Sequence, residues 1–190
     1  MDSSKLAVKL FVQDSTATDA RSFVPLFHEW IQTHAIANHL LIDVADYRHV
    51  ENGPGIVLVA HEGNFSMDAT EGRLGLLYTR KQPLIGNFAA RLQQTIRTAL
   101  QAAALIESTP ALEGKVRFRT DNMLIRINDR LAAPNTPETW NAVRPDMEDL
   151  LSRLYEDQLK FDHQANPETL FQIQLKVASQ CSLATLVKRI

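Results

Sequence analysis

This chain of 190 residues has a single cysteine, little net charge and no long apolar run. The single cysteine, Cys181, excludes an intrachain disulfide, so nothing in the sequence requires an oxidising compartment. A net charge of −2 and a pI near 6.3 exclude the strong global field with which basic proteins hold nucleic acid or an anionic membrane surface. No segment reaches the roughly 18 to 20 apolar residues that span a bilayer. We therefore predict no membrane insertion and no binding of nucleic acid through overall charge.

The beginning of the chain also lacks the features of a secretory signal. Met1-Asp2-Ser3-Ser4 carries an acid where a signal peptide needs basic residues, and the apolar residues that follow alternate with polar ones. Together with the single cysteine, this predicts a soluble protein in the cytoplasm.

Complete motifs for metal, phosphate or nucleophilic chemistry are missing as well. His61-Glu62 lacks the second histidine of a zinc-protease helix, and Asp43 with Asp46 lacks the glycine and downstream glutamate of a calcium loop. The Gly53-Pro54-Gly55 turn leads into an apolar run instead of a helix N-terminus, so it does not form a phosphate-binding loop. No Gly-x-Ser-x-Gly sequence is present. We predict neither a metal nor an organic cofactor.

Apolar sequence is plentiful, at 45% of residues, which is enough to bury one substantial core. Short alternating or continuous apolar runs predict strands, and apolar residues at helical spacing predict three helices. The continuous run at 56–60 predicts a central strand buried on both faces. The predicted strands are 6–12, 40–44, 56–60, 74–79, 116–118, 123–131 and 170–177, and the predicted helices are 22–34, 87–107 and 140–154.

This order of elements predicts an α+β (mixed α/β) fold, with one mixed sheet or a two-part sheet core and about three helices. The lack of a long linker favours a single compact domain over residues 1–190. Residues 6–60 and 123–178 repeat an order of strand, helix, aspartate-bearing strand and long strand, which suggests a pseudo-repeat of a βαββ-type unit. Its halves, 1–86 and 115–190, are joined by the helix at 87–107. A chance likeness of two such units explains the pattern equally well.

Polar side chains gather in residues 40–81, at the ends of strands that are otherwise apolar. His61, Glu62 and Asp68 are the candidate catalytic residues, because an imidazole oriented by a carboxylate is the arrangement of a general base. The alternative is that His61 bonds only to a backbone carbonyl or to Arg73 at the end of a strand.

The same stretch contains four candidate ligand-binding residues. These are Asp43, Asp46, Arg73 and Arg80. Residues 43–71 hold six acids and one base, a net charge of −5, whereas residues 72–106 hold five bases and no acid, a net charge of +5. The two blocks either pair or form solvated faces; the alternative is a basic patch that receives an anionic ligand or an acidic partner.

Two functions of different classes fit these observations. The favoured one is a non-catalytic binding or scaffold protein that acts as a homo-oligomer. We expect the contact to lie on an edge strand or on the long helix at 87–107. The alanine-rich sequence of that helix and the apolar stretch at 182–187 prompt this hypothesis. The alternative is a small-molecule enzyme or ligand-binding domain with a polar site from His61 to Arg73, performing proton transfer or hydrolysis on a small anionic ligand. Contact of the basic segment with nucleic acid is a weaker third hypothesis.

Overall fold

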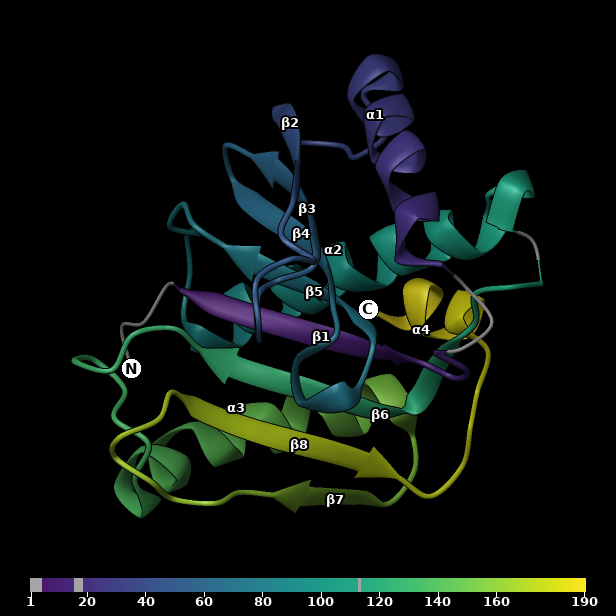
Figure 1. The fold of residues 1–190 in the computed structure, drawn as a ribbon. Helices are drawn as coiled ribbons and strands as arrows, with labels where there is room; N and C mark the ends of the chain where they lie inside the picture. Colours follow the sequence, from purple (N-terminus) through teal and green to yellow (C-terminus); the bar gives the residue numbers. More distant parts are fainter. Residues whose placement is uncertain (1–4, 16–18, 113) are drawn as a thin grey trace.

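Eight strands form a single sheet in the computed structural model, which describes residues 5–15, 19–112 and 114–190 (Figure 1). All neighbouring strands are antiparallel, in the order β2-β3-β4-β5-β1-β6-β8-β7. The predicted α+β class is confirmed, with a sheet that is antiparallel throughout. The strands are β1 (Leu6–Val12), β2 (Leu41–Asp46), β3 (Ile56–Ala60), β4 (Gly63–Asp68), β5 (Gly75–Arg80), β6 (Phe118–Ile127), β7 (Leu159–Asp162) and β8 (Phe171–Val177).

The helices lie behind the sheet in the view of Figure 1. Helix α2 packs against β1 and β5, α1 against β2, α3 against β7, and the short α4 against α2 and α3. Within the described part of the chain, no helix combines the length and the hydropathy needed to cross a bilayer. The helices are α1 (Phe23–Thr33), α2 (Phe88–Ser108), α3 (Pro137–Tyr155) and α4 (Leu183–Arg189).

Three of these helices begin after a residue whose side chain caps the free backbone N–H groups of the first turn. The Asn87 side chain accepts a hydrogen bond from the N–H of Ala90 at 2.9 Å, and Thr136 and Ser182 have the same role for α3 and α4. Such caps stabilise a helix by about 1 kcal/mol. The three predicted helices are confirmed within a few residues, and most of the apolar stretch at 182–187 lies in the fourth helix.

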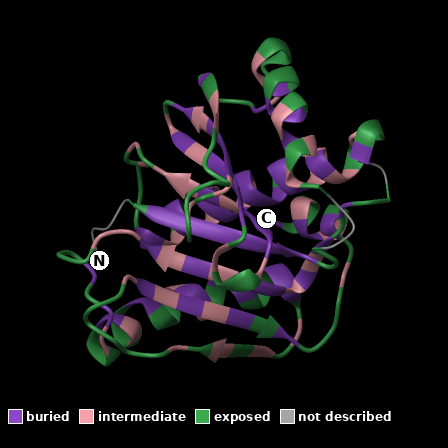
Figure 2. Cartoon of the chain, in the orientation of Figure 1, coloured by how far each residue is buried: buried purple, intermediate pink, exposed green. Residues whose placement is uncertain are grey.

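Strand β1 lies in the interior of the sheet and is buried along its whole length (Figure 2). Leu6, Val8 and Leu10 face the helices, as the alternation of the sequence requires. The prediction that 56–60 is an interior strand buried on both faces is confirmed, because β3 pairs with β2 and β4 and is buried except at Val59. It lies one strand from the edge of the sheet. Its continuous apolar sequence indicates burial, and burial does not specify a position in the sheet.

The segment after β3 forms a strand that is not among the predicted ones. In β4, Phe65 and Met67 face the core while Asn64 and Ser66 alternate with them, a pattern that the polar residues obscured. The proposed equivalence of 6–60 with 123–178 stays a prediction. Strands β2 and β7 are the two edge strands, and they pair with β3 and β8. Strand β8 lies beside β6, whereas β4 and β5 separate β3 from β1.

Candidate functional site

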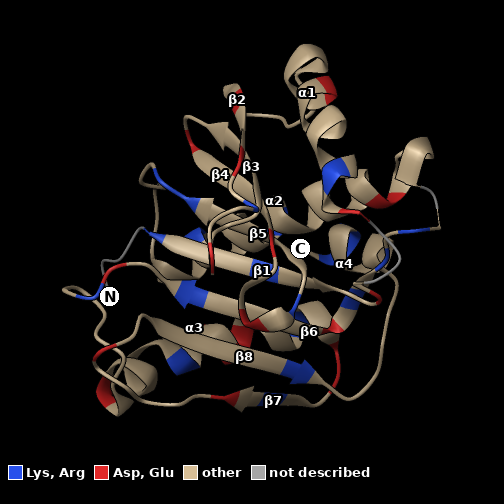
Figure 3. Cartoon of the chain, in the orientation of Figure 1, with Lys and Arg blue, Asp and Glu red and all other residues tan. Residues whose placement is uncertain are grey.

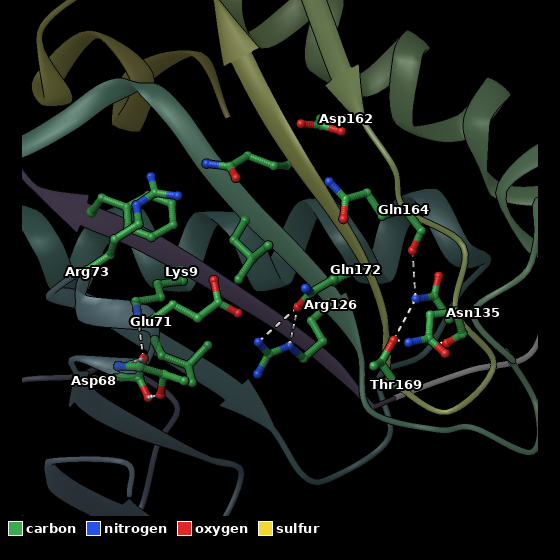
Figure 4. A pocket seen from close by; sticks show the side chains of 16 residues that line it. Lys9, Asp68, Glu71, Arg73, Arg126, Asn135, Asp162, Gln164, Thr169 and Gln172 are labelled. Atoms are coloured by element: carbon green, nitrogen blue, oxygen red, sulfur yellow. Dashed lines mark hydrogen bonds and ion pairs between the residues drawn. The ribbon is translucent and has the colours of Figure 1, made fainter. Parts of the chain in front are cut away.

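A polar pocket lies on the side of the sheet that faces away from the helices, called the open face below. Lys9 pairs in register with Leu77 of β5 and Leu124 of β6, so these three side chains share the open face and line the pocket. The pocket encloses about 300 Å³, at the lower end of the range for small-molecule sites. The β4–β5 loop, residues 69–74, and the β7–β8 loop, residues 163–170, border it on opposite sides (Figure 4).

The most deeply buried charges of the pocket are Lys9 and Asp68, which form an ion pair between β1 and β4. Only 3% of Lys9 and 5% of Asp68 is exposed. Asp68 also accepts hydrogen bonds from Thr70, at 2.6 Å from the hydroxyl and 3.2 Å from the backbone N–H. Both carboxylate oxygens are therefore occupied, and they attach the start of the β4–β5 loop to the sheet.

Burial lowers the pKa of Lys9, because desolvation penalises the ammonium ion more than the hydrogen bond and charge of Asp68 stabilise it. Phe11, the next residue of β1 on the open face, lies 5.5 Å from the Lys9 ammonium. The guanidinium carbon of Arg73 lies 3.7 Å from the centre of the same ring. Phe11 therefore supports two cations, and the stacking sets the plane of the Arg73 guanidinium.

Two arginines of the pocket are held by glutamines of β8 instead of by carboxylates. Gln172 pairs in register with Arg126, and its amide oxygen accepts from Arg126 Nε at 3.3 Å and Nη2 at 3.0 Å. With the Gln174 amide oxygen facing Arg73, that oxygen lies 2.8 Å from Nη1 and 3.1 Å from Nη2. Neither arginine has an ion-pair partner among the described residues. An amide orients a guanidinium without neutralising its charge.

The opposite wall of the pocket rests on Asn135, which is only 1% exposed. Its Nδ2 donates to the backbone oxygen of Gln164 at 3.1 Å and to the Thr169 hydroxyl at 2.9 Å. The amide oxygen therefore faces His163, whose Nε2 lies 2.8 Å away and must carry the proton. Burial lowers the pKa of His163, which favours this neutral form. These bonds give the β7–β8 loop a rigid hydrogen-bonded base.

The structure brings two of the predicted site residues, Asp68 and Arg73, into this pocket. His61 and Glu62 lie in the β3–β4 turn, at the other end of the hairpin. About 20 Å of extended strand separates Glu62 from Asp68. The predicted cluster of His61, Asp68 and Arg73 is therefore not formed, and Asp68 is bonded to Lys9 instead.

The other acidic candidates bind backbone N–H groups along the edge strand β2. Glu62 accepts from the N–H of Leu40 at 2.8 Å, and Asp43 accepts from the N–H of Val44 at 2.7 Å. Asp46 accepts a hydrogen bond from the backbone N–H of Arg48 at 3.1 Å. Bonding alternates along an antiparallel strand. Tyr47 donates to the oxygen of Gly55, just before β3, so the Val44 N–H points away from β3. Asp43 and Asp46 therefore occupy donors that a neighbouring strand would otherwise use, whereas the backbone of Leu40 faces β3, because its oxygen accepts from the N–H of His61.

The pKa values of these carboxyl groups reflect the bonds they make. The hydrogen bond from Arg48 lowers the pKa of Asp46 to about 2. Burial opposes the ionisation of Glu62, but hydrogen bonds from the N–H groups of Leu40 and of Glu62 itself outweigh it, and its pKa is lowered. Asp43, Asp46 and Glu62 therefore bind backbone in or beside β2, and none of them lines the pocket.

Arg80, the remaining candidate, belongs to a buried polar network around Tyr78. Arg80 donates to the Tyr78 hydroxyl at 3.3 Å and to the backbone oxygen of Gln82 at 2.8 Å. His39 Nε2 lies 2.8 Å from the same hydroxyl, and its Nδ1 lies 3.0 Å from the oxygen of Ala37. Nδ1 must therefore carry the proton of neutral His39, and burial lowers the pKa of this imidazole.

The predicted basic block does not collect into one patch. Arg73 enters the pocket, Arg80 belongs to the Tyr78 network, and Arg91 is buried within α2. Arg97 donates to the backbone oxygen of Ile190 in the C-terminal part of the chain. Figure 3 shows acidic and basic residues interspersed over the open face. No single electrostatic surface therefore corresponds to residues 72–106.

Some pocket residues that are not among the predicted site residues have a recognisable pattern in the sequence. Lys9 is a lone charge within an otherwise apolar strand, and such a residue needs a buried partner. Gln172 and Gln174 alternate with the apolar residues of β8, which places both on one face. Arg126 follows the same alternation in β6. Their convergence on one cavity depends on the strand order, which local alternation does not contain.

Among the residues that the structure describes, no group of three or more His, Cys, Asp or Glu side chains is arranged to hold a metal ion. Comparison with protein-family models, with curated proteins and with solved structures finds no match to this chain. The open-face pocket is therefore interpreted from its own chemistry.

Proposed function

We propose that this protein is a non-catalytic binding domain whose open-face pocket takes a small polar molecule with a carboxylate or phosphate group. The observation that carries the proposal is the pair of arginines, Arg126 and Arg73, held by Gln172 and Gln174. Each guanidinium is positioned by an amide and stays positively charged. The rest of the rim supplies amide and hydroxyl groups that suit a polar ligand.

Arginines without an ion-pair partner are common at protein surfaces, but Arg73 and Arg126 are also held in a defined orientation. Arg73 is stacked on Phe11, and Arg126 lies in register with Gln172. Orientation before binding reduces the entropy that a ligand must overcome. Guanidinium groups match the planar oxygens of carboxylate and phosphate. This combination supports recognition of an anionic group, and the polar rim supports selectivity among small molecules.

The test uses malonate, citrate and inorganic phosphate as probes, with sodium chloride at matched ionic strength as the reference. We expect the probes to raise the melting temperature of the wild-type protein above the chloride reference, because a ligand that binds only the folded state stabilises it. The Gln172→Glu, Gln174→Glu double variant keeps an acceptor beside each arginine but neutralises its charge. We expect it to lose at least about tenfold in affinity, which corresponds to about 1.4 kcal/mol.

A matched control is Arg144→Gln, because Arg144 is exposed on α3 and pairs with Glu148 away from the pocket. We expect this control to bind the probes like the wild type. Stabilisation that survives unchanged in the glutamate double variant, or disappears equally in the Arg144 variant, would contradict the proposal. Isothermal titration calorimetry of the same proteins gives the affinities directly.

We propose self-association as a second candidate function, because apolar side chains are exposed along the edge hairpin β2–β3. Leu40 is 61% exposed and Ile42 is 54% exposed, and Tyr47 and Val50 continue the exposed apolar surface. The partner is a second copy of the chain, in contact through side chains. Helix α2 and the 182–187 segment do not support the contact, since both pack inside one chain. A monomer mass by light scattering at micromolar concentration would exclude this candidate.

A further inference from the structure

We infer that the ligand of the open-face pocket is a small zwitterion, an amino-carboxylate, whose cationic group lies against Glu71. The inference rests on the proposed function, since it assumes that Arg73 and Arg126 hold an anionic group. It adds the second half of the recognition, which is a carboxylate presented to the same cavity.

The charges around the pocket balance. Lys9 and Asp68 neutralise each other within the sheet. The charged side chains that remain on the rim are Arg73 and Arg126 on one hand and Glu71 and Asp162 on the other. None of these four forms an ion pair with a described residue. A site for a simple anion gains nothing from unpaired carboxylates, whereas a site for a zwitterion needs both signs.

Glu71 is aimed at the cavity by an unusual backbone conformation. Its φ is 62° and its ψ is 25°, a left-handed conformation that is unfavourable for a residue with a Cβ atom. Gly72 follows with a φ of 68°. Figure 4 shows the Glu71 side chain between Lys9 and Arg126, directed into the pocket. A glycine at position 71 would form this turn with less strain, so the turn alone does not explain a glutamate there.

The loop that carries Glu71 is fixed from both ends. Asp68 binds Thr70 before it, and Arg73 after it is stacked on Phe11. The N–H of Gly72 donates to the oxygen of Ala69 at 3.0 Å, which closes the turn between them. The Glu71 carboxylate therefore lines the same pocket as Arg73 and Arg126 without forming an ion pair with either. This arrangement keeps a cation-binding and an anion-binding group apart until a ligand connects them.

The test compares zwitterions with anions of the same length. The probes are glycine, β-alanine and γ-aminobutyrate against acetate, propionate and butyrate, with binding measured by NMR chemical-shift titration. For at least one length we expect the wild type to bind the zwitterion about tenfold more tightly than its carboxylate. In Glu71→Gln, which keeps the shape but loses the charge, we expect that ratio to fall to about one while carboxylate binding persists.

Glu71→Gly separates recognition from loop stability. We expect this variant to have a higher melting temperature, because it relieves the left-handed conformation, and to lose the preference for zwitterions. A Glu71→Gly or Glu71→Gln protein that keeps the full preference overturns the inference. So does wild-type protein that binds each carboxylate as tightly as its zwitterion.

These outcomes also distinguish the two proposals. If carboxylates bind the wild type and are lost in the Gln172→Glu, Gln174→Glu variant, but zwitterions have no advantage, the proposed function stands and the zwitterion inference is wrong. If neither series binds but malonate, citrate or phosphate does, only the zwitterion inference is wrong; if none of these probes binds, both are wrong.

Discussion

The acid-rich end of the β2–β3 hairpin and the open-face pocket contain the same kinds of side chain and use them differently. At the hairpin, Asp43 accepts from the N–H of Val44 in β2, and Glu62 accepts from the N–H of Leu40 just before it. In the pocket, Asp68 is bonded to a buried lysine, and Arg73 and Arg126 are held by amides. A carboxylate that binds the backbone of its own chain stabilises the fold. A guanidinium held by a neutral amide keeps a positive charge that can bind another molecule.

The comparison shows why the density of charged residues along a sequence does not locate a site. Residues 43–71 hold all four candidate acids, yet three of them bind backbone N–H groups in or beside β2. An edge strand with free N–H groups pairs readily with other chains. Charged side chains on the edge strand are one way to prevent such pairing. The pocket is identified by the partners of its charges: amides beside arginines, and one neutralised pair beneath them.

The largest expected effect comes from breaking the buried pair. Asp68→Ala leaves Lys9 charged and unpartnered among buried groups, so we expect a loss of about 3–5 kcal/mol in the free energy of unfolding. The Lys9→Met, Asp68→Leu double variant should recover most of that loss, because an apolar pair of similar volume removes the desolvation cost. Urea unfolding followed by tryptophan fluorescence measures both. A single variant within 1 kcal/mol of wild type, or a double variant no better than the single, would contradict this account.

A smaller effect is expected from opening the edge. Asp43→Ala, Asp46→Ala and Glu62→Ala together remove three acceptors from the N–H groups of the β2 region. We expect self-association at least about tenfold tighter than in the wild type, measured by sedimentation equilibrium. Unchanged mass at all concentrations would show that the carboxylates do not protect the edge.

The matched control removes three acids from helix α3, where no strand edge exists. Its substitutions are Glu138→Ala, Glu148→Ala and Asp149→Ala. We expect its association to match the wild type, since the change in net charge is the same and only the location differs. Equal association of the two triple variants would assign the effect to net charge instead of to the edge.

The smallest expected effect concerns His39. Because its folded pKa lies below the ordinary value of 6.5, the unfolded chain binds more protons as the pH falls past 6.5. The contribution of His39 to the free energy of unfolding is fully present above pH 6.5 and is lost as the pH falls toward the folded pKa. We expect His39→Gln to reduce the drop in melting temperature between pH 7.5 and 5.5, and His28→Gln, an exposed histidine of α1, to leave it unchanged. His163 retains its own share of the drop, because burial lowers its pKa too.

Much of the fold was predictable, and the errors have identifiable causes. The run at 56–60 is strand β3 with the same bounds, and the helical spacing from 87 to 107 corresponds to α2. Strand β4 was missed because its outward positions are polar and it follows a glycine turn. The expected mixed sheet is antiparallel throughout. The rule that ligands bind beyond the carboxyl ends of parallel strands therefore does not apply at His61, just after β3.

The sequence by itself determined the periodicities, and with them the strands, the helices, the α+β class and the apolar core. These follow from side chains a few residues apart, because alternation and helical spacing are local properties of a chain. Only the tertiary structure decided that Lys9 meets Asp68, 59 residues away, and that glutamines of β8 hold arginines from β6 and from the β4–β5 loop. Those contacts depend on the order β4-β5-β1-β6-β8, which is chosen by the packing of the whole core and not by any single segment.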